Sequence, residues 1–103
     1  MKSTLNPETL NDEALNKASE CLKALAHPTR IAIIKALADN ELCVSDILEH
    51  TGTSQSNISQ HLTLMKNKNI LVCYKKENHV FYKVRDERVF DLVKLIDEMS
   101  CSV

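Results

Sequence analysis

The sequence predicts a mainly α-helical fold with a small β-hairpin, in the order α-α-α-α-β-β-α. Apolar residues recur at helical spacing through the first two thirds of the chain, which is typical of helices that bury one face. Between residues 70 and 84 the pattern changes to β-branched and aromatic runs. With 103 residues, 44% hydrophobic and 26% charged, the chain has the make-up of one domain, residues 1–103.

Two helices are predicted before residue 39. The first, over residues 11–26, has an apolar stripe made of Leu15, Ala18, Leu22 and Leu25. Asn11 is placed to cap it. Pro28 ends this helix and starts the next, because proline is tolerated at a first helical position and restricts the residue before it. The buried stripe expected on the second helix consists of Ile31, Ile34, Leu37 and Ala38.

A helix-turn-helix unit is predicted over residues 44–67. Its first helix starts at Val44, after a polar turn, and ends at Gly52, the residue best suited to a left-handed helix terminus. Its second helix is capped by Ser54 and buries Ile58, Leu62 and Met65. Uncharged polar side chains cover the rest of its surface: Gln55, Ser56, Ser59, Gln60 and Thr63.

A β-hairpin is predicted over residues 70–84. Its strands are the runs 70–74 and 80–84, and they join at a basic tip where Asn78 is expected to adopt a positive φ. A last helix over residues 86–100 is expected to bury Val89, Phe90, Val93, either Leu95 or Ile96, and Met99.

Composition excludes several classes of protein. The single glycine, Gly52, excludes the glycine-rich phosphate loops of nucleotide-binding enzymes. No apolar run approaches the roughly 18 residues of a membrane span, and no signal peptide is evident, so we expect a cytoplasmic protein with no membrane partner. The four cysteines are far apart and form no Cys-x-x-Cys pair, which argues against a disulfide framework or a zinc ribbon.

Charge is segregated along the chain, although the net charge is only −1. Residues 1–53 carry 5 basic and 8 acidic side chains, residues 54–85 carry 6 and 1, and residues 86–103 carry 2 and 5. A basic block on an otherwise acidic protein is typical of a protein that binds a polyanion. A solvated surface patch is the alternative.

A short helix, a turn at Gly52, a polar helix and a basic hairpin together form the pattern of a winged helix-turn-helix that binds DNA. The second helix of such a unit enters the major groove, and the hairpin, or wing, contacts phosphates or the minor groove. The DNA-binding candidates are Gln55, Ser56, Asn57, Ser59, Gln60, His61 and Lys66 on the helix, with Lys75, Lys76 and His79 on the wing. Taken alone, each is better explained as an exposed polar group.

Three segments carry a resemblance to a known family: LKALAHPTR at 22–30, ELCVSDI at 41–47 and SQSNISQHL at 54–62. From about residue 18 to residue 84 the sequence resembles the ArsR/SmtB family of bacterial repressors. The hairpin is similar to that family's wing, with Asn78 or His79 where glycine is usual. The resemblance assigns base contacts to Gln55, Ser56, Ser59 and Gln60, and it leaves His61 either contacting DNA or packed inward.

The resemblance also implies a symmetric dimer that binds an operator and releases it when an inducer binds. Dimerisation follows independently from the apolar stripes of the two terminal helices, residues 11–26 and 86–100, which leave surface to be covered. We expect the interface to include Leu15, Leu22, Val93 and Ile96. Two-fold symmetric proteins match palindromic half-sites about one helical turn apart.

The metal sites of the family are incomplete in this sequence. Its arsenic and cadmium or lead sensors have a second cysteine where this chain has Ser45, so Cys43 lacks the thiolate partner that a soft-metal site needs. Its zinc and cobalt sensors use histidines on the last helix, which here contains Asp91, Asp97 and Glu98 but no histidine. We therefore expect no resident metal and no cofactor.

Thiol chemistry remains as the predicted means of sensing. Cys101 ends the last helix, as one cysteine does in the family's persulfide and oxidant sensors, but their other cysteine has no equivalent near Lys35. Cys21 and Cys101 are one candidate pair, and Cys43 acting alone near a helix N-terminus is another. The alternative for Cys21 and Cys73 is that they are small apolar packing residues.

The sequence thus predicts a homodimeric repressor that binds double-stranded operator DNA. An inducer, either an oxidant or a sulfane sulfur compound that reacts with thiols, is expected to release it from the DNA. One alternative is a metal(loid)-responsive repressor with a non-standard thiol site. Another is a winged-helix module that binds proteins. An enzyme is disfavoured, because no Cys-His motif is present and the chain is too short for a deep pocket.

Overall fold

The computed structural model describes residues 5–38 and 40–100, and the predicted order of elements is confirmed. The helices are η1 (Pro7–Thr9), α1 (Asp12–Leu25), α2 (Pro28–Leu37), α3 (Val44–Thr51), α4 (Gln55–Asn67) and α5 (Arg88–Ser100). The strands are β1 (Leu42–Cys43), β2 (Leu71–Lys76) and β3 (His79–Val84). The last helix begins at Arg88 instead of residue 86, since Asp86 precedes it and accepts the Arg88 backbone N–H at 3.0 Å.

The sheet has a third strand that the sequence pattern did not predict. The antiparallel order is β1-β3-β2, and β1 pairs Leu42 with Tyr82 and Cys43 with Phe81. A strand of two residues is too short to show an alternating pattern, and its partner lies about forty residues further along the chain. The pairing ties the start of α3 to the wing.

The helix ends follow the predicted capping residues. Asn11 Oδ1 accepts the Ala14 backbone N–H at 2.9 Å, and Ser54 Oγ accepts that of Asn57 at 3.3 Å. Gly52 ends α3 with φ of 69°, in the left-handed region that glycine adopts without strain.

The core is built around α2. Eight side chains are almost wholly buried, each worth roughly 1.5–3 kcal/mol of transfer free energy: Ile33, Ile34, Leu37, Ile47, Ile58, Leu62, Met65 and Leu71. Ile33 was not predicted to be buried, and the prediction for Ala38 was wrong, since Ala38 is exposed in a left-handed C-cap. Because α2 contacts α1, α3, α4, α5 and β3, it is enclosed on several sides and shows no one-sided stripe.

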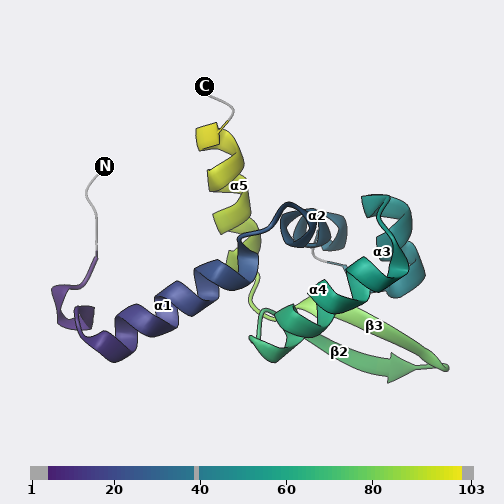
Figure 1. The fold of residues 1–103 in the computed structure, drawn as a ribbon, viewed down its shortest axis with the longest axis horizontal. Helices are drawn as coiled ribbons and strands as arrows, with labels where there is room; N and C mark the ends of the chain where they lie inside the picture. The colour runs from purple at the N-terminus through teal and green to yellow at the C-terminus, as the bar shows by residue number, and fades with distance from the viewer. Residues whose placement is uncertain (1–4, 39, 101–103) are drawn as a thin grey trace.

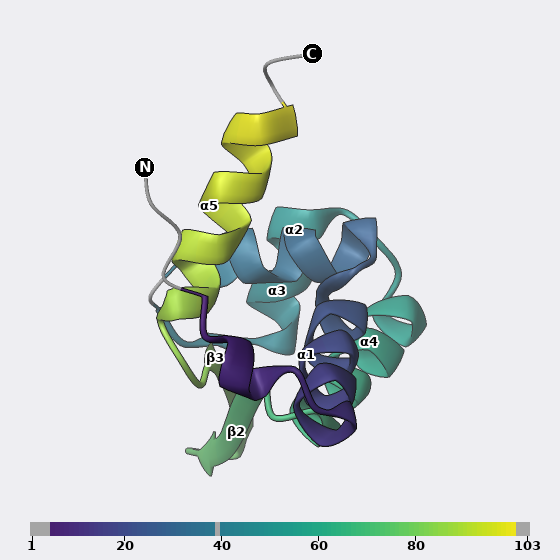
Figure 2. The ribbon, with the colours of Figure 1, turned by 90° about the vertical axis from the view of Figure 1, so that its left-hand side faces the viewer.

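The two terminal helices leave much of their apolar surface open. Only Ala24 and Leu25 of α1 are buried, and only Val93 of α5. The predicted burial of Leu95 or Ile96 and of Met99 is wrong within one chain, since they are 56%, 46% and 71% exposed. In Figure 1, α5 rises from the rest of the molecule and α1 extends to the left, while the hairpin tip points to the right. In Figure 2, α1 crosses in front and α5 stands above it. No helix of the described residues is long and apolar enough to cross a membrane.

Candidate nucleic-acid interface

Helix α4 presents an uncharged polar face to solvent. It packs on the core through Ile58, Leu62 and Met65, which are at most 1% exposed. On its exposed surface lie Gln55, Ser56, Ser59, Gln60 and Thr63. Thr63 was absent from the predicted site, although its spacing, four residues after Ser59 and three after Gln60, places it on the same face. Hydroxyl and amide groups of this kind both donate and accept hydrogen bonds, as contacts to base edges require.

Two of the predicted DNA-binding residues of α4 are engaged within the protein. Asn57 is half-buried, and its Nδ2 donates a hydrogen bond to Thr53 Oγ1 at 2.9 Å. His61 is also half-buried, and its ring lies 4.3 Å from the ring of His27, centroid to centroid. Burial, and then the charges of His27 and Arg30, lower the pKa of His61. Within the chain, His61 is thus packed against His27.

The wing is a hairpin with a two-residue turn. Glu77 and Asn78 have φ of 51° and 67°, so the positive φ predicted for Asn78 is confirmed and Glu77 shares it. A tight turn of this type needs positive φ at both central residues. Lys76 lies opposite His79 and Lys75 opposite Val80, so the two lysines point to opposite faces of the hairpin. All three cationic candidates, Lys75, Lys76 and His79, are exposed.

Helix α4 and the wing lie side by side. Strand β2 contacts α4, and in Figure 1 the N-terminal end of α4 and the wing tip lie on the same side of the molecule. Stacking of Tyr74 on Phe81, with ring centroids 5.9 Å apart, supports the hairpin between its tip and the core. Lys66 is exposed in the last turn of α4. The polar helix and the basic hairpin are therefore parts of one surface.

The described cysteines differ in their surroundings. Cys43 is half-buried at the junction of β1 and α3, and its thiol donates a hydrogen bond to Asp46 Oδ2 at 3.1 Å. Cys73 is half-buried opposite Tyr82 in the sheet. Burial, and then Cys73, raise the pKa of Tyr82. Cys101 lies outside the described residues, and no group of three His, Cys, Asp or Glu among residues 5–38 and 40–100 is placed to hold a metal ion.

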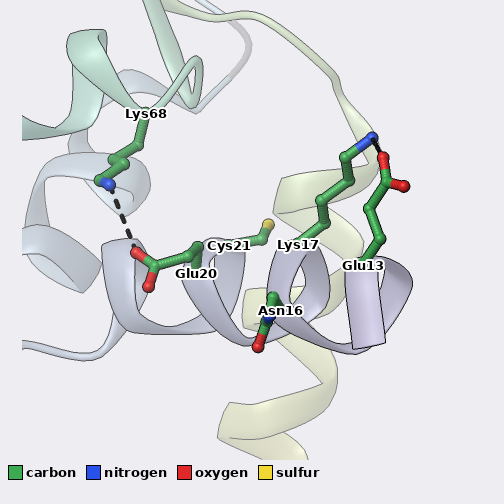
Figure 3. A pocket seen from close by; sticks show the side chains of 6 residues that line it. All are labelled: Glu13, Asn16, Lys17, Glu20, Cys21 and Lys68. Carbon is green, nitrogen blue, oxygen red and sulfur yellow. Dashed lines mark hydrogen bonds and ion pairs between the residues drawn. The ribbon is translucent and has the colours of Figure 1, made fainter. Parts of the chain in front are cut away.

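Cys21 is exposed beside an open, charged hollow between α1 and the end of α4 (Figure 3). Its side chain lies between two ion pairs, Lys17–Glu13 at 3.2 Å and Lys68–Glu20 at 3.3 Å. The second pair joins α1 to the residue that follows α4. The hypothesis that Cys21 is a small core residue is therefore wrong, whereas Cys73 is partly packed.

A polar recognition helix after a short helix and turn, next to a basic hairpin, defines a winged helix-turn-helix protein that binds DNA. A family model described as "bacterial regulatory protein, arsR family" matches residues 27–71. The transcriptional regulator MJ1325 of Methanocaldococcus jannaschii is 39% identical over 88 residues, which cover 84% of this chain and 99% of that protein. The chain belongs to this family, and it is a winged-helix transcriptional repressor of the ArsR/SmtB type, not an enzyme.

Other relatives agree with this assignment. The repressor SmtB of Mycobacterium tuberculosis is 32% identical over 79% of this chain and 60% of that protein. The solved structure of HlyU from Vibrio cholerae superposes with a TM-score of 0.77 at 31% identity, covering 88% of this chain and 99% of that one. A winged helix-turn-helix domain from Mycobacterium bovis, described as homodimeric, has the same fold at 22% identity, with a TM-score of 0.76 and coverage of 96% and 90%.

Proposed function

We propose that residues 1–103 act as one domain in a cytoplasmic, homodimeric repressor that places α4 in the major groove of its operator and the wing against the phosphates. The observation that carries this proposal is the uncharged, exposed face of α4, whose side chains suit base edges. A major groove about 12 Å wide admits a helix of this kind. The lysines of the wing supply the attraction to phosphate that does not depend on sequence.

The test starts from a duplex selected from a random pool, because no operator sequence is assumed. Gln55→Ala and Ser59→Ala are expected to weaken binding to this duplex by about 1–3 kcal/mol each, since each removes a contact to base edges. Asn16→Ala, at an exposed polar side chain on the charged face of α1, is the matched control and is expected to bind like the parent. Variants at Gln55 and Ser59 that discriminate between selected and random duplex as well as the parent does would contradict the assignment of α4.

The alternative of a protein-binding module differs in its response to salt. Binding of DNA releases condensed counterions, so the affinity falls steeply as the salt concentration rises. A polar helix that docks on a protein would lose much less affinity over the same range. If the chain binds no duplex from the pool at low salt, the protein-binding alternative replaces the present proposal.

The proposed dimer rests on the uncovered apolar surface of α1 and α5. Leu15, Leu22 and Ile96 are 50%, 55% and 46% exposed. Leu22 and Ile96 lie at a cavity of about 290 Å³ bounded by α1, α2 and α5, whose lining is entirely apolar: Leu22, Leu25, Ala26, Ile31, Leu92, Val93 and Ile96. Val93, also predicted at the interface, is only 7% exposed and contributes to this cavity from the core side. A second copy of the chain would remove this apolar surface from water.

For sensing, we propose that an inducer acts on thiols, with Cys43 as the residue best placed to affect DNA binding. Cys43 lies where β1, which pairs with the wing, meets α3. Oxidation or sulfur transfer at its Sγ removes the S–H that donates to Asp46, at the point where wing and helix-turn-helix join. Cys21 is accessible, and its pairing with Cys101 is the other candidate step of this kind. A metal(loid) bound at a non-standard thiol site is the alternative.

A further inference from the structure

Two histidines meet where the recognition helix α4 crosses the start of α2. His61 lies in the middle of α4, and His27 is the residue that precedes α2. Their ring centroids are 4.3 Å apart, and the ring planes are tilted by 43°. This contact joins α4 to α2 on the half-buried side of α4, away from its exposed polar face.

His27 has a second role at this point, because its ring caps α2. Its Nδ1 accepts the Thr29 backbone N–H at 3.0 Å, so the neutral ring carries its proton on Nε2. A protonated ring has no acceptor left for that N–H, and it adds positive charge at a helix N-terminus, where negative charge is favoured. The cap therefore requires a neutral His27.

The charged groups that act on His61 are His27 and Arg30, and no carboxylate is among them. Arg30 is in the first turn of α2, and its buried Nε has no hydrogen-bond partner within the described residues. Burial, first, and then these two groups lower the pKa of His61. A proton on either ring would add a second positive charge beside Arg30.

Groups on the other elements that pack against α4 do not offset this charge. Glu20 of α1 binds Lys68 at 3.3 Å, and Asp46 of α3 accepts the thiol of Cys43. Besides the Cys73 thiol, β2 adds the half-buried Tyr74, which stacks on Phe81, and two exposed lysines near the hairpin tip, Lys75 and Lys76. A proton on either ring therefore weakens the contact between the two histidines, while the buried side chains of α4 still hold the helix on the core.

We propose that the contact between His27 and His61 positions the recognition helix and makes operator binding weaken as the protein is acidified. This inference rests on the proposed DNA-binding function. An unperturbed histidine has a pKa of about 6.5, so proton uptake below that pH favours forms in which the ring of His61 has moved away from His27, which changes the orientation of α4 while its apolar side stays on the core. By linkage, the loss of affinity begins near the pKa of an unperturbed histidine and ends at the lowered pKa of His61. His61 is thus a positioning residue and does not contact bases.

The expected fall in operator affinity on acidification is opposite in sign to the general effect of acid on DNA binding. Acidification makes a protein more positive, and positive charge strengthens the attraction to phosphate. A fall in affinity for the selected duplex therefore cannot come from this general effect. The affinity for a random duplex, measured in parallel, gives the size of the general effect.

The experiment measures the affinity for the selected duplex at pH 7.5 and pH 5.5, at constant sodium concentration. For the parent we expect a loss of about 3- to 10-fold between the two values. The side chains introduced by His61→Gln and His27→Asn cannot take up the proton, and asparagine at position 27 can still cap α2. In both variants the affinity at pH 5.5 should therefore equal or exceed the affinity at pH 7.5. His50→Gln, at an exposed histidine of α3 that is not among the proposed DNA-binding residues, is the control and should keep the loss seen in the parent.

A second measurement needs no DNA. The Cε1–H resonance of His61 should titrate below pH 6.5 in the parent and at a higher pH in His27→Asn, because a neighbouring positive charge has been removed. Parent affinity that is level or higher at pH 5.5, or a His61→Gln variant that keeps the loss, would overturn the inference. Failure to bind any duplex at pH 7.5 would instead refute the proposed function, so the two failures are distinct.

Discussion

The wing lysines make the DNA-binding proposal quantitative, through the dependence of affinity on salt. The perturbation is Lys76→Ala, at an exposed residue beside the hairpin turn and across from His79. Each phosphate contact contributes a slope of about −0.9 to log K against log salt. A two-fold symmetric dimer presents two wings, so the variant loses two phosphate contacts. The magnitude of its slope should therefore be smaller than that of the parent by about 1.8. Between 50 and 200 mM salt the parent should then lose roughly tenfold more affinity than the variant.

Lys75 provides an independent second contact, because it points to the other face of the hairpin, opposite Val80. The effects of Lys75→Ala and Lys76→Ala should therefore add in the double variant, for selected and random duplexes alike. Fluorescence anisotropy of a labelled duplex over a salt series measures each slope, and Lys94→Ala on α5 is the matched control. If the double variant keeps the slope of the parent, the wing does not contact phosphates and the proposed docking is wrong.

Three further predictions follow from other parts of the structure. Leu22→Asp should shift the protein from dimer to monomer in sedimentation, because it places a charge on the apolar surface of α1. Asn16→Asp, on the charged face of α1, should not. Cys43→Ser should abolish the release of DNA by an oxidant or a polysulfide. If this variant releases DNA as the parent does, another thiol is the sensing residue. Hydrogen bonds from the Arg88 side chain and backbone lower the pKa of Asp86 to about 2 from 3.8. The stability that these hydrogen bonds give is present above pH 4 and is lost as the pH falls toward 2. The melting temperature of Asp86→Asn should therefore change less between pH 4 and pH 2 than that of the parent. The same change in both proteins would show that the pair of Asp86 and Arg88 does not stabilise the fold.

Much of the fold was predictable because its signals are local. Asn11, Ser54 and Gly52 mark helix ends through hydrogen bonds and backbone conformations that span at most four residues. The two-residue turn at Glu77 and Asn78 follows from the same kind of short-range rule. Strand β1 was not predictable, because its pairing partner β3 is remote in the sequence and its two residues show no period.

The candidate site divides in a similar way. Periodicity alone placed Gln55, Ser59 and Gln60 on the exposed face of α4, because Ile58 and Leu62 fix which side of the helix is buried. The same periodicity could not decide the role of His61, which lies at the boundary between the buried and exposed sides. That role depends on His27, which the chain brings beside it only when α2 packs across α4.

By itself, the sequence determined the order of the elements, the polar character of the recognition helix and the basic character of the wing, since each depends on residues close together in the chain. Only the tertiary structure decided which cysteine lies at the junction of wing and helix-turn-helix, and which apolar residues of α5 remain uncovered. These properties depend on the relative placement of distant segments. Examples are the pairing of Leu42 with Tyr82 and the ion pair between Lys35 Nζ and Asp97 Oδ2 at 2.7 Å. Such contacts form because a shared core buries apolar surface from all of these segments at once. The total area buried depends on every segment together, so no local sequence pattern determines it.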